Sequence, residues 1–185
     1  MRLFLCLLSL FIATSLPSQT LENKIQLAYQ KIQGLEDQKK ALQDEIETLK
    51  FQKIHRDLEA AGTPKLLNGD VPVQHAALRL AYCEEHEQAR WVAHIILPDV
   101  MSGTVYRSND FRPDPMVPTG SAVEADYLLK FLQPDSTWKY DGFGYDRGHL
   151  APSADFRWSQ KALSESYYYS NMSPMLGDFN RDSWA

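Results

Sequence analysis

The stretch YDRGHLAPSADF, residues 145–156, concentrates titratable side chains in a short segment. It holds one histidine, one arginine and two aspartates beside a glycine and a proline, with little helical or strand periodicity. Irregular segments that are held in place by their neighbours carry function more often than packing does. We therefore take His149 as the first candidate functional residue.

Length, composition and charge bound the class of protein. The chain has 185 residues, which is enough for one domain with extensions. A hydrophobic content of 44% with 11% aromatic residues argues against a disordered protein. The net charge of -5 argues against a general nucleic-acid coat protein, which would be basic.

The first residues form an apolar leader, MRLFLCLLSLFIATSLPSQ. One arginine precedes an apolar run over residues 3–13, and small and turn-forming residues follow it. This run is too short to span a bilayer, and it predicts a secretory signal peptide over residues 1–18, with a buried N-terminal helix as the alternative. We therefore expect a secreted or periplasmic protein with no stable membrane span after cleavage. Cleavage would leave Cys83 as the remaining cysteine, which excludes an intrachain disulfide and a cysteine-rich metal site.

Residues 20–60 follow a heptad pattern, in which apolar residues recur at alternating spacings of four and three. Lys39 and Lys53 fall on the same seam, where polar residues usually set register and oligomer number. The pattern predicts a coiled coil that makes the chain a homo-oligomer. The alternative is one long amphipathic helix folded back on the following domain. The apolar seam positions are Leu21, Ile25, Ala28, Ile32, Leu35, Leu42, Ile46 and Leu49.

A glycine and a proline, Gly62 and Pro64, end the heptad segment and predict a linker before a domain over residues 66–185. Patterns of apolar, β-branched and aromatic residues predict the elements of this domain. They are strands at 78–83, 89–98 and 164–174, the last stopped by Pro174, and a short helix at 121–132. Strands and helices mixed in this order predict an α+β domain.

Three further stretches carry polar residues of the kind that bind phosphate: RSNDFRPD (107–114), SNMSP (170–174) and FNRDSW (179–184). No serine elbow or glycine-rich phosphate loop accompanies them, which disfavours nucleophilic catalysis and nucleotide binding. A neutral imidazole accepts a proton from water near pH 7, arginine matches phosphate oxygens, and an amide oxygen suits Mg²⁺. Together these residues predict phosphate chemistry assisted by a hard cation. The candidates are Arg107, Arg112, Asp146, Arg147, His149, Asn171 and Asn180.

The chain resembles the DNA/RNA non-specific endonuclease family in three stretches: DRGHLAPSADFRWS (146–159), YYYSNMSP (167–174) and FNRDSW (179–184). That family includes secreted bacterial nucleases and mitochondrial endonuclease G. The match covers about residues 66–185. The resemblance implies the ββα-metal (His-Me finger) fold. It also implies cleavage of DNA and RNA with little sequence preference, dependent on Mg²⁺ with Mn²⁺ able to substitute, leaving 5′-phosphate ends.

The resemblance also implies a role for each matching residue. His149 would be the general base that deprotonates the attacking water. Asn180 would be the single direct protein ligand of Mg²⁺. Arg147 and Arg107 would bind the scissile phosphate, and Asn171 would help to hold the site. The alternatives are a turn at Asn171, a helix cap at Asn180 and an ordinary surface position for Arg107.

The sequence departs from the family pattern in three places. Met175 stands where glutamine is usual, and Asp182 stands where glycine is usual. The chain stops at Ala185, just before a Leu-Glu pair whose glutamate helps to order the water shell of the metal in the family. We therefore expect a C-terminally truncated domain that is poorly folded and nearly inactive.

The charge balance leaves other functions open. Residues 59–185 hold eleven Lys and Arg against seventeen Asp and Glu, so nucleic-acid binding would rest on a local patch and the metal. One alternative is a catalytically inactive protein that binds nucleic acid or acts through its coiled coil. Another is a phosphodiesterase that acts on smaller phosphate esters.

Overall fold

The computed structural model describes residues 18–184, except for the side chains of residues 18, 19, 130, 131 and 138–143. The predicted signal peptide lies outside the described residues, apart from its last position. Every helix within residues 18–184 is too short or too polar to cross a lipid bilayer. The chain divides into two compact units, Met1–Ile46 and Glu47–Ala185.

Helix α1 spans Ser18–Ala61 and confirms the predicted helix. It contains no proline and is rich in leucine, glutamine, lysine and glutamate, which all favour the helical state. Gly62 ends it at a positive φ of 79°, a conformation that glycine adopts without strain. In the first unit the heptad seam is exposed: Leu21 is 61% exposed and Leu42 is 59% exposed. Pairing of this seam with a second copy stays a prediction.

A three-stranded antiparallel sheet forms the centre of the second unit, with strand order β1-β2-β3. The strands are β1 (Asp70–Gln74), β2 (Leu78–Cys83) and β3 (Gln88–His94). β2, the strand predicted from LRLAYC, lies in the middle, and it is buried apart from the partly exposed Arg79. The strand predicted at 89–98 ends four residues early, because Pro98 begins a 3-10 helix.

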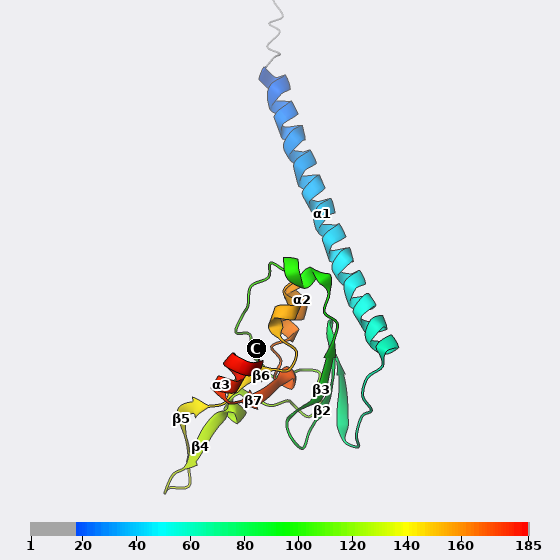
Figure 1. The fold of residues 1–185 in the computed structure, drawn as a ribbon. Coiled ribbons are helices and arrows are strands. Elements are labelled where there is room, and N and C mark those ends of the chain that lie inside the picture. The colour runs from blue at the N-terminus through cyan, green and yellow to red at the C-terminus, as the bar shows by residue number, and fades with distance from the viewer. Residues whose placement is uncertain (1–17, 185) are drawn as a thin grey trace, which may run out of the picture. The chain divides into compact units, whose positions relative to one another are not determined.

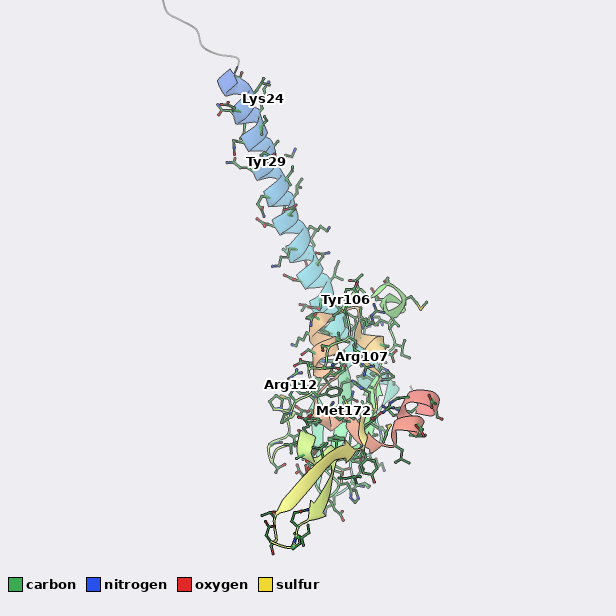
Figure 2. All side chains as sticks on the ribbon, turned by 90° about the vertical axis from the view of Figure 1, so that its left-hand side faces the viewer. Lys24, Tyr29, Tyr106, Arg107, Arg112 and Met172 are labelled. Carbon is green, nitrogen blue, oxygen red and sulfur yellow. The ribbon has the colours of Figure 1, made fainter. Side chains whose placement is uncertain are left out.

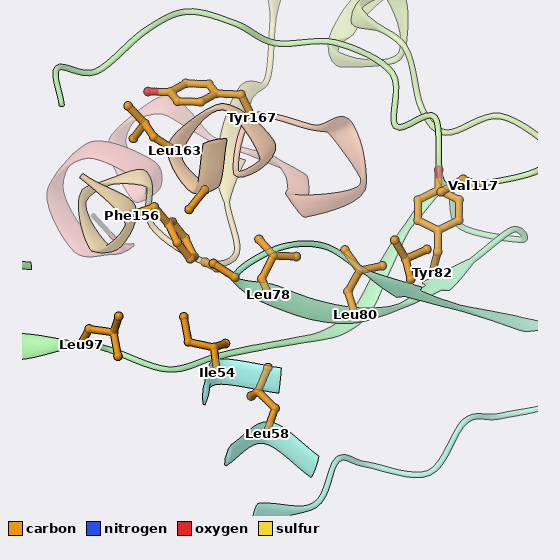
Figure 3. Packing of buried hydrophobic residues seen from close by; sticks show 14 residues of the cluster. Ile54, Leu58, Leu78, Leu80, Tyr82, Leu97, Val117, Phe156, Leu163 and Tyr167 are labelled. Carbon is orange, nitrogen blue, oxygen red and sulfur yellow. The ribbon is translucent and has the colours of Figure 1, made fainter. Parts of the chain in front are cut away.

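The core of the second unit forms around β2 (Figure 3). Helix α1 contributes side chains from its last turns, and the segment after the DRGH motif contributes others, so residues far apart in sequence converge. Each fully buried aliphatic or aromatic side chain stabilises the fold by about 1.5–3 kcal/mol. The largest members of this cluster are Ile54, Leu58, Leu78, Leu80, Tyr82, Phe156, Leu163 and Tyr167.

Two small hairpin-like sheets and several short helices make up the rest of the second unit. Figure 1 shows strands β6 and β7 beside the C-terminal helix α3. Helices and strands are thus mixed along the described chain, as the predicted α+β class requires. The remaining elements are the 3-10 helices Pro98–Ser102, Glu124–Tyr127, Ser153–Phe156 and Tyr169–Asn171, strands β4 (Leu128–Leu132), β5 (Trp138–Gly144), β6 (Asp146–His149) and β7 (Met172–Met175), helices α2 (Gln160–Glu165) and α3 (Gly177–Phe179), and a π-helical turn at Asn180–Trp184.

Two predicted elements are wrong. The helix expected at 121–132 is a single 3-10 turn followed by β4, because residues from Leu128 onward pair with β5 instead of continuing a helix. The strand expected at 164–174 is instead the end of α2, a turn, an isolated bridge at Tyr168 and a 3-10 helix, and only its last three residues belong to β7. Pro174 lies within β7 instead of stopping it, since a strand with one partner tolerates a missing N–H on its other edge.

Candidate active site

The DRGH motif is a strand, β6, and not the irregular segment that its composition indicates. It pairs antiparallel with β7, with Arg147 opposite Pro174 and His149 opposite Met172. Strand alternation places Arg147 and His149 on one face. Gly148 lies between them, and a Cβ there would lie 2.2 Å from the sulfur of Met175, so a larger residue would force the Met175 side chain to shift. The pairing with β7 therefore fixes the positions of both functional candidates.

Asn171 joins the segment after His149 to the neighbouring chain. Its side chain is completely buried. Its Oδ1 accepts a hydrogen bond from the Ala151 amide at 2.9 Å, and its Nδ2 donates to the carbonyls of Ala151 and Ser166 at 3.0 and 2.8 Å. The amide of Leu150 also donates to the Asn171 carbonyl at 2.9 Å. These contacts connect Asn171 to the backbone and not to a substrate.

The C-terminal segment is attached to β6 through Asp146. Arg181 donates two hydrogen bonds to this carboxylate, both at 3.0 Å, and the Asn180 side-chain Nδ2 donates a third at 3.2 Å. The Arg181 and Asn180 contacts hold the pKa of Asp146 below its usual value. Trp184 donates from its indole to the His149 carbonyl at 2.7 Å. The short helical segment is therefore held at two points and does not stand alone.

The helix N-cap expected as an alternative role for Asn180 is wrong. The helical segment begins at Gly177 with Leu176 as its cap, and the Asn180 amide donates to the Leu176 carbonyl at 2.8 Å. The side-chain Nδ2 bond to Asp146 fixes the orientation of the amide group. Asn180 therefore stands inside the segment, with its Oδ1 as the side-chain atom suited to a cation.

His149 lies between aromatic rings. Tyr167 meets its imidazole edge-on at a centroid distance of 4.8 Å, and Phe111 lies at 5.8 Å. Burial, and next the positive charge of Arg107, lower the pKa of His149 to about 4. Its Nε2 is buried and has no hydrogen-bond partner among the described atoms. The ring is therefore neutral near pH 7, and such an unsatisfied buried atom points to a missing ligand or water.

The three candidate arginines have different surroundings. The Arg147 guanidinium lies 4.2 Å from the centre of the Phe111 ring and donates to Glu124 at 3.1 Å. Arg107 is exposed and lies close enough to His149 to affect its pKa.

Arg112 is part of the scaffold. It donates to the Asp110 carboxylate at 2.6 Å and to the Ser164 carbonyl at 3.0 Å. Its guanidinium also lies 4.1 Å from the centre of the Tyr168 ring. Arg112 therefore joins two segments of the fold and does not line the pocket described next.

A pocket of about 430 Å³ brings most of the candidates together. Asn171 does not line it. Within residues 18–184 no three His, Cys, Asp or Glu side chains cluster to hold a metal, so a cation here would take most of its ligands from water. Mg²⁺ keeps several waters in this way, and the Asn180 oxygen therefore fits it. The lining residues are Arg107, Asp146, Arg147, His149, Pro152, Ser153, Ala154, Asn180, Arg181 and Trp184.

Four residues that line the pocket or contact Arg147 were not predicted from the sequence. Trp184 and Arg181 stand in the quoted FNRDSW stretch, and their closeness in sequence to Asn180 could have indicated them. Phe111 and Glu124 left no signal, because their contacts with Arg147 join segments that are separated by 23 to 36 residues.

Comparison with known proteins gives consistent matches. A model of the family described as DNA/RNA non-specific endonuclease matches residues 58–185. The bovine protein named "Endonuclease G, mitochondrial" (Bos taurus) is 35% identical over 111 residues, which is 59% of this chain and 33% of that protein. The protein named "Nuclease EXOG, mitochondrial" from Danio rerio is 30% identical over 143 residues, which is 76% of this chain and 37% of that protein.

A solved structure is also similar. It is titled "Crystal structure of the EndoG/EndoGI complex: Mechanism of EndoG inhibition", and it matches with a TM-score of 0.53 and 31% identity. The match covers 68% of this chain and 46% of that chain. The present chain spans about a third of the length of the curated relatives described above.

These names contradict the predicted secreted or periplasmic location, because the similar nucleases are named mitochondrial. The prediction was wrong because it used the leader alone, and a short basic and apolar leader does not by itself identify the compartment. The family model covers well over half of the chain, and the relatives and the solved structure agree with it. The chain belongs to the DNA/RNA non-specific endonuclease family.

Proposed function

We propose that this chain is a metal-dependent endonuclease that hydrolyses phosphodiester bonds of DNA and RNA with little sequence preference. The observation that carries the proposal is the neutral His149 imidazole, whose buried Nε2 has no hydrogen-bond partner among the described atoms, in a pocket that Arg107, Arg147 and Asn180 also line. Family membership supports the same chemistry.

His149 acts as the general base in this proposal. Its ring is unprotonated above about pH 4, so it can take a proton from the attacking water. A bound phosphate would offset the charge of Arg107, which is one of the two causes that lower the pKa of His149. Substrate would therefore raise the pKa of the base toward the operating pH, where general-base catalysis is most effective.

The two pocket arginines bind the scissile phosphate. Both line the pocket with His149, and guanidinium groups offset the negative charge that develops on phosphorus in the transition state. The Phe111 ring supports the Arg147 guanidinium from one face. Glu124 pairs with Arg147 in the absence of substrate, so a phosphate would compete with this carboxylate.

Asn180 is the proposed ligand for Mg²⁺, for which Mn²⁺ can substitute, and its hydrogen bond to Asp146 orients the amide. When bound there, the cation would offset negative charge on the phosphate oxygens. Asn171 positions the segment that follows His149 through its three side-chain hydrogen bonds.

The arrangement of β6, β7 and the C-terminal helical segment supports the ββα-metal fold for a nuclease domain over residues 66–185. Residues 20–60 form the proposed coiled coil, which would make the protein a homo-oligomer. The exposed seam on α1 supports this assignment, since eight apolar side chains at heptad spacing face solvent. The relatives' names support a mitochondrial location.

The test is cleavage of supercoiled plasmid by the purified chain with Mg²⁺ and with a chelator. His149→Ala should lower the cleavage rate about 10²–10⁴-fold while leaving DNA binding largely intact, because the base acts on water. The matched control is His86→Ala, which changes an exposed histidine in a turn and should cut like wild type.

Three results would reject the proposal. Cleavage that persists with a chelator would show that the reaction does not need the metal. Cleavage by His149→Ala at nearly the wild-type rate would show that His149 is not the general base. Hydrolysis of a small chromogenic diester without plasmid cleavage would favour the phosphodiesterase alternative.

A further inference from the structure

A second pocket adjoins the candidate active site. It has a volume of about 350 Å³ and shares Arg107, Ser153 and Ala154 with the first pocket. Tyr106 and Arg157 line it from the other side. Because Arg107 belongs to both pockets, a ligand with its phosphate at this arginine can reach the second pocket with the adjoining part of the molecule.

Tyr106 is held beside this pocket with its ring in solvent. The Val105 amide donates to the Arg157 carbonyl at 3.0 Å, and the Arg157 Nε donates to the Val105 carbonyl at 3.0 Å. Gly103 permits this close approach, since a Cβ there would lie 2.6 Å from the Arg157 backbone. The Tyr106 side chain is nevertheless 85% exposed (Figure 2 labels it beside Arg107).

An aromatic ring that is so exposed contributes little to the core. The backbone next to it is fixed, so binding a ligand against the ring would cost little ordering entropy. Aromatic side chains on such surfaces stack with nucleobases, and this stacking is tolerant of sequence because every base has a π face. The chemistry of the two pockets therefore corresponds to the two parts of one nucleotide, phosphate and base.

We propose that Tyr106 stacks on an unpaired nucleobase adjacent to the scissile phosphate, with this base in the second pocket and its phosphate at Arg107. This assignment rests on the proposed function of the first pocket. It makes single-stranded or locally unpaired nucleic acid the preferred substrate class. In a duplex each base is already stacked on its neighbours, and freeing it costs energy.

The charge of the chain supports a contribution from stacking. Residues 59–185 carry seventeen acidic against eleven basic side chains, so phosphate contacts are few for a nucleic-acid-binding domain. Stacking on Tyr106 would add affinity that does not depend on releasing counterions. Binding at this subsite should therefore depend on the base more than on salt concentration.

The test measures the affinity of the full chain, carrying His149→Ala to prevent cleavage, for two labelled single-stranded tetranucleotides. One is tetrathymidylate, and the other has the same backbone without bases. The base-bearing oligonucleotide should bind about 5–150-fold more tightly, the range for one stacked base. Adding Tyr106→Ala should bring this ratio close to one, and Tyr106→Phe should preserve it because the ring remains. Tyr29→Ala removes a tyrosine that is 64% exposed on α1 and serves as the matched control.

A ratio that is unchanged in Tyr106→Ala would overturn the proposal, and so would equal loss in the Ala and Phe variants. No measurable binding of tetrathymidylate would also overturn it. Circular dichroism melting of each variant should match the parent, since the substituted ring is exposed. Plasmid cleavage by the chain with His149 intact is scored separately. Its absence would reject the proposed function, while the binding ratio would still decide the role of Tyr106.

Discussion

Replacing Asn171 by alanine should lower the free energy of unfolding of the second unit by roughly 3–5 kcal/mol. The side chain is fully buried and makes three hydrogen bonds. The three bonds together contribute about 2–3 kcal/mol net, and leaving the buried backbone groups of Ala151 and Ser166 without these partners adds about 1–2 kcal/mol. Since domains of this size are stable by about 5–15 kcal/mol, the variant should stay folded without denaturant. Urea titration followed by fluorescence measures the loss.

The cleavage activity of Asn171→Ala distinguishes a residue that positions the fold from one that takes part directly in the reaction. Asn171 does not line the pocket around His149, so the variant should retain measurable cleavage at temperatures well below its melting point. Asn68→Ala, at an exposed turn before β1, is the control and should change stability by less than about 0.5 kcal/mol. Unchanged stability together with lost cleavage would refute this reasoning and place Asn171 in the chemistry.

Three further predictions concern the proposed base, the proposed metal ligand and helix α1. The pKa of His149 is about 4 in the folded state against about 6.5 when unfolded, so the unfolded chain binds more protons between these values and stability should fall by about 3 kcal/mol as pH drops from 6.5 to 4. Urea titrations should show this slope in wild type and a shallower one in His149→Asn, and equal slopes would contradict it. Asn180→Ala should raise the Mg²⁺ concentration needed for cleavage and Asn180→Asp should partly restore it, whereas an unchanged Mg²⁺ titration would place the ligand elsewhere. A peptide of residues 20–62 should become more helical with concentration, and polar residues at positions 35 and 42 should abolish this; concentration-independent helicity would indicate a monomeric helix.

The sequence predicted what depends on local pattern. The heptad spacing indicated α1, and the alternation of large apolar and other residues in LRLAYC indicated β2, because periodicity determines these elements over a few residues. The strand expected around 164–174 was largely wrong. The three tyrosines favour strands intrinsically, but here Tyr167 lies in a turn, Tyr168 forms a single bridge with Arg112 and Tyr169 begins a 3-10 helix. Tertiary contacts override propensity at such positions.

In the candidate site, too, the sequence predicted what depends on local motifs and not what depends on tertiary contacts. The motif stretches contain His149, Arg147, Arg107 and Asn180, and the structure brings these side chains to one pocket. The cation–π contact of Arg147 with Phe111 and its ion pair with Glu124 could not be predicted. Both depend on segments whose spatial positions the sequence pattern does not specify. The adjoining pocket beside Tyr106 depends on two hydrogen bonds between Val105 and Arg157, which are 52 residues apart in sequence.

The attachment of the C-terminal segment to β6 has a consequence for protein synthesis. Asp146 and Asn180 are 34 residues apart, and His149 and Trp184 are 35 residues apart. A ribosome makes the β6 residues first, and domains fold as units while the chain emerges. A nascent chain that has exposed His149 but not residues 177–184 would contain the imidazole without the proposed metal ligand. Under the proposed function, such a nascent chain would be unable to cut the messenger RNA from which it is being translated until the helical turns at residues 177–184 had docked.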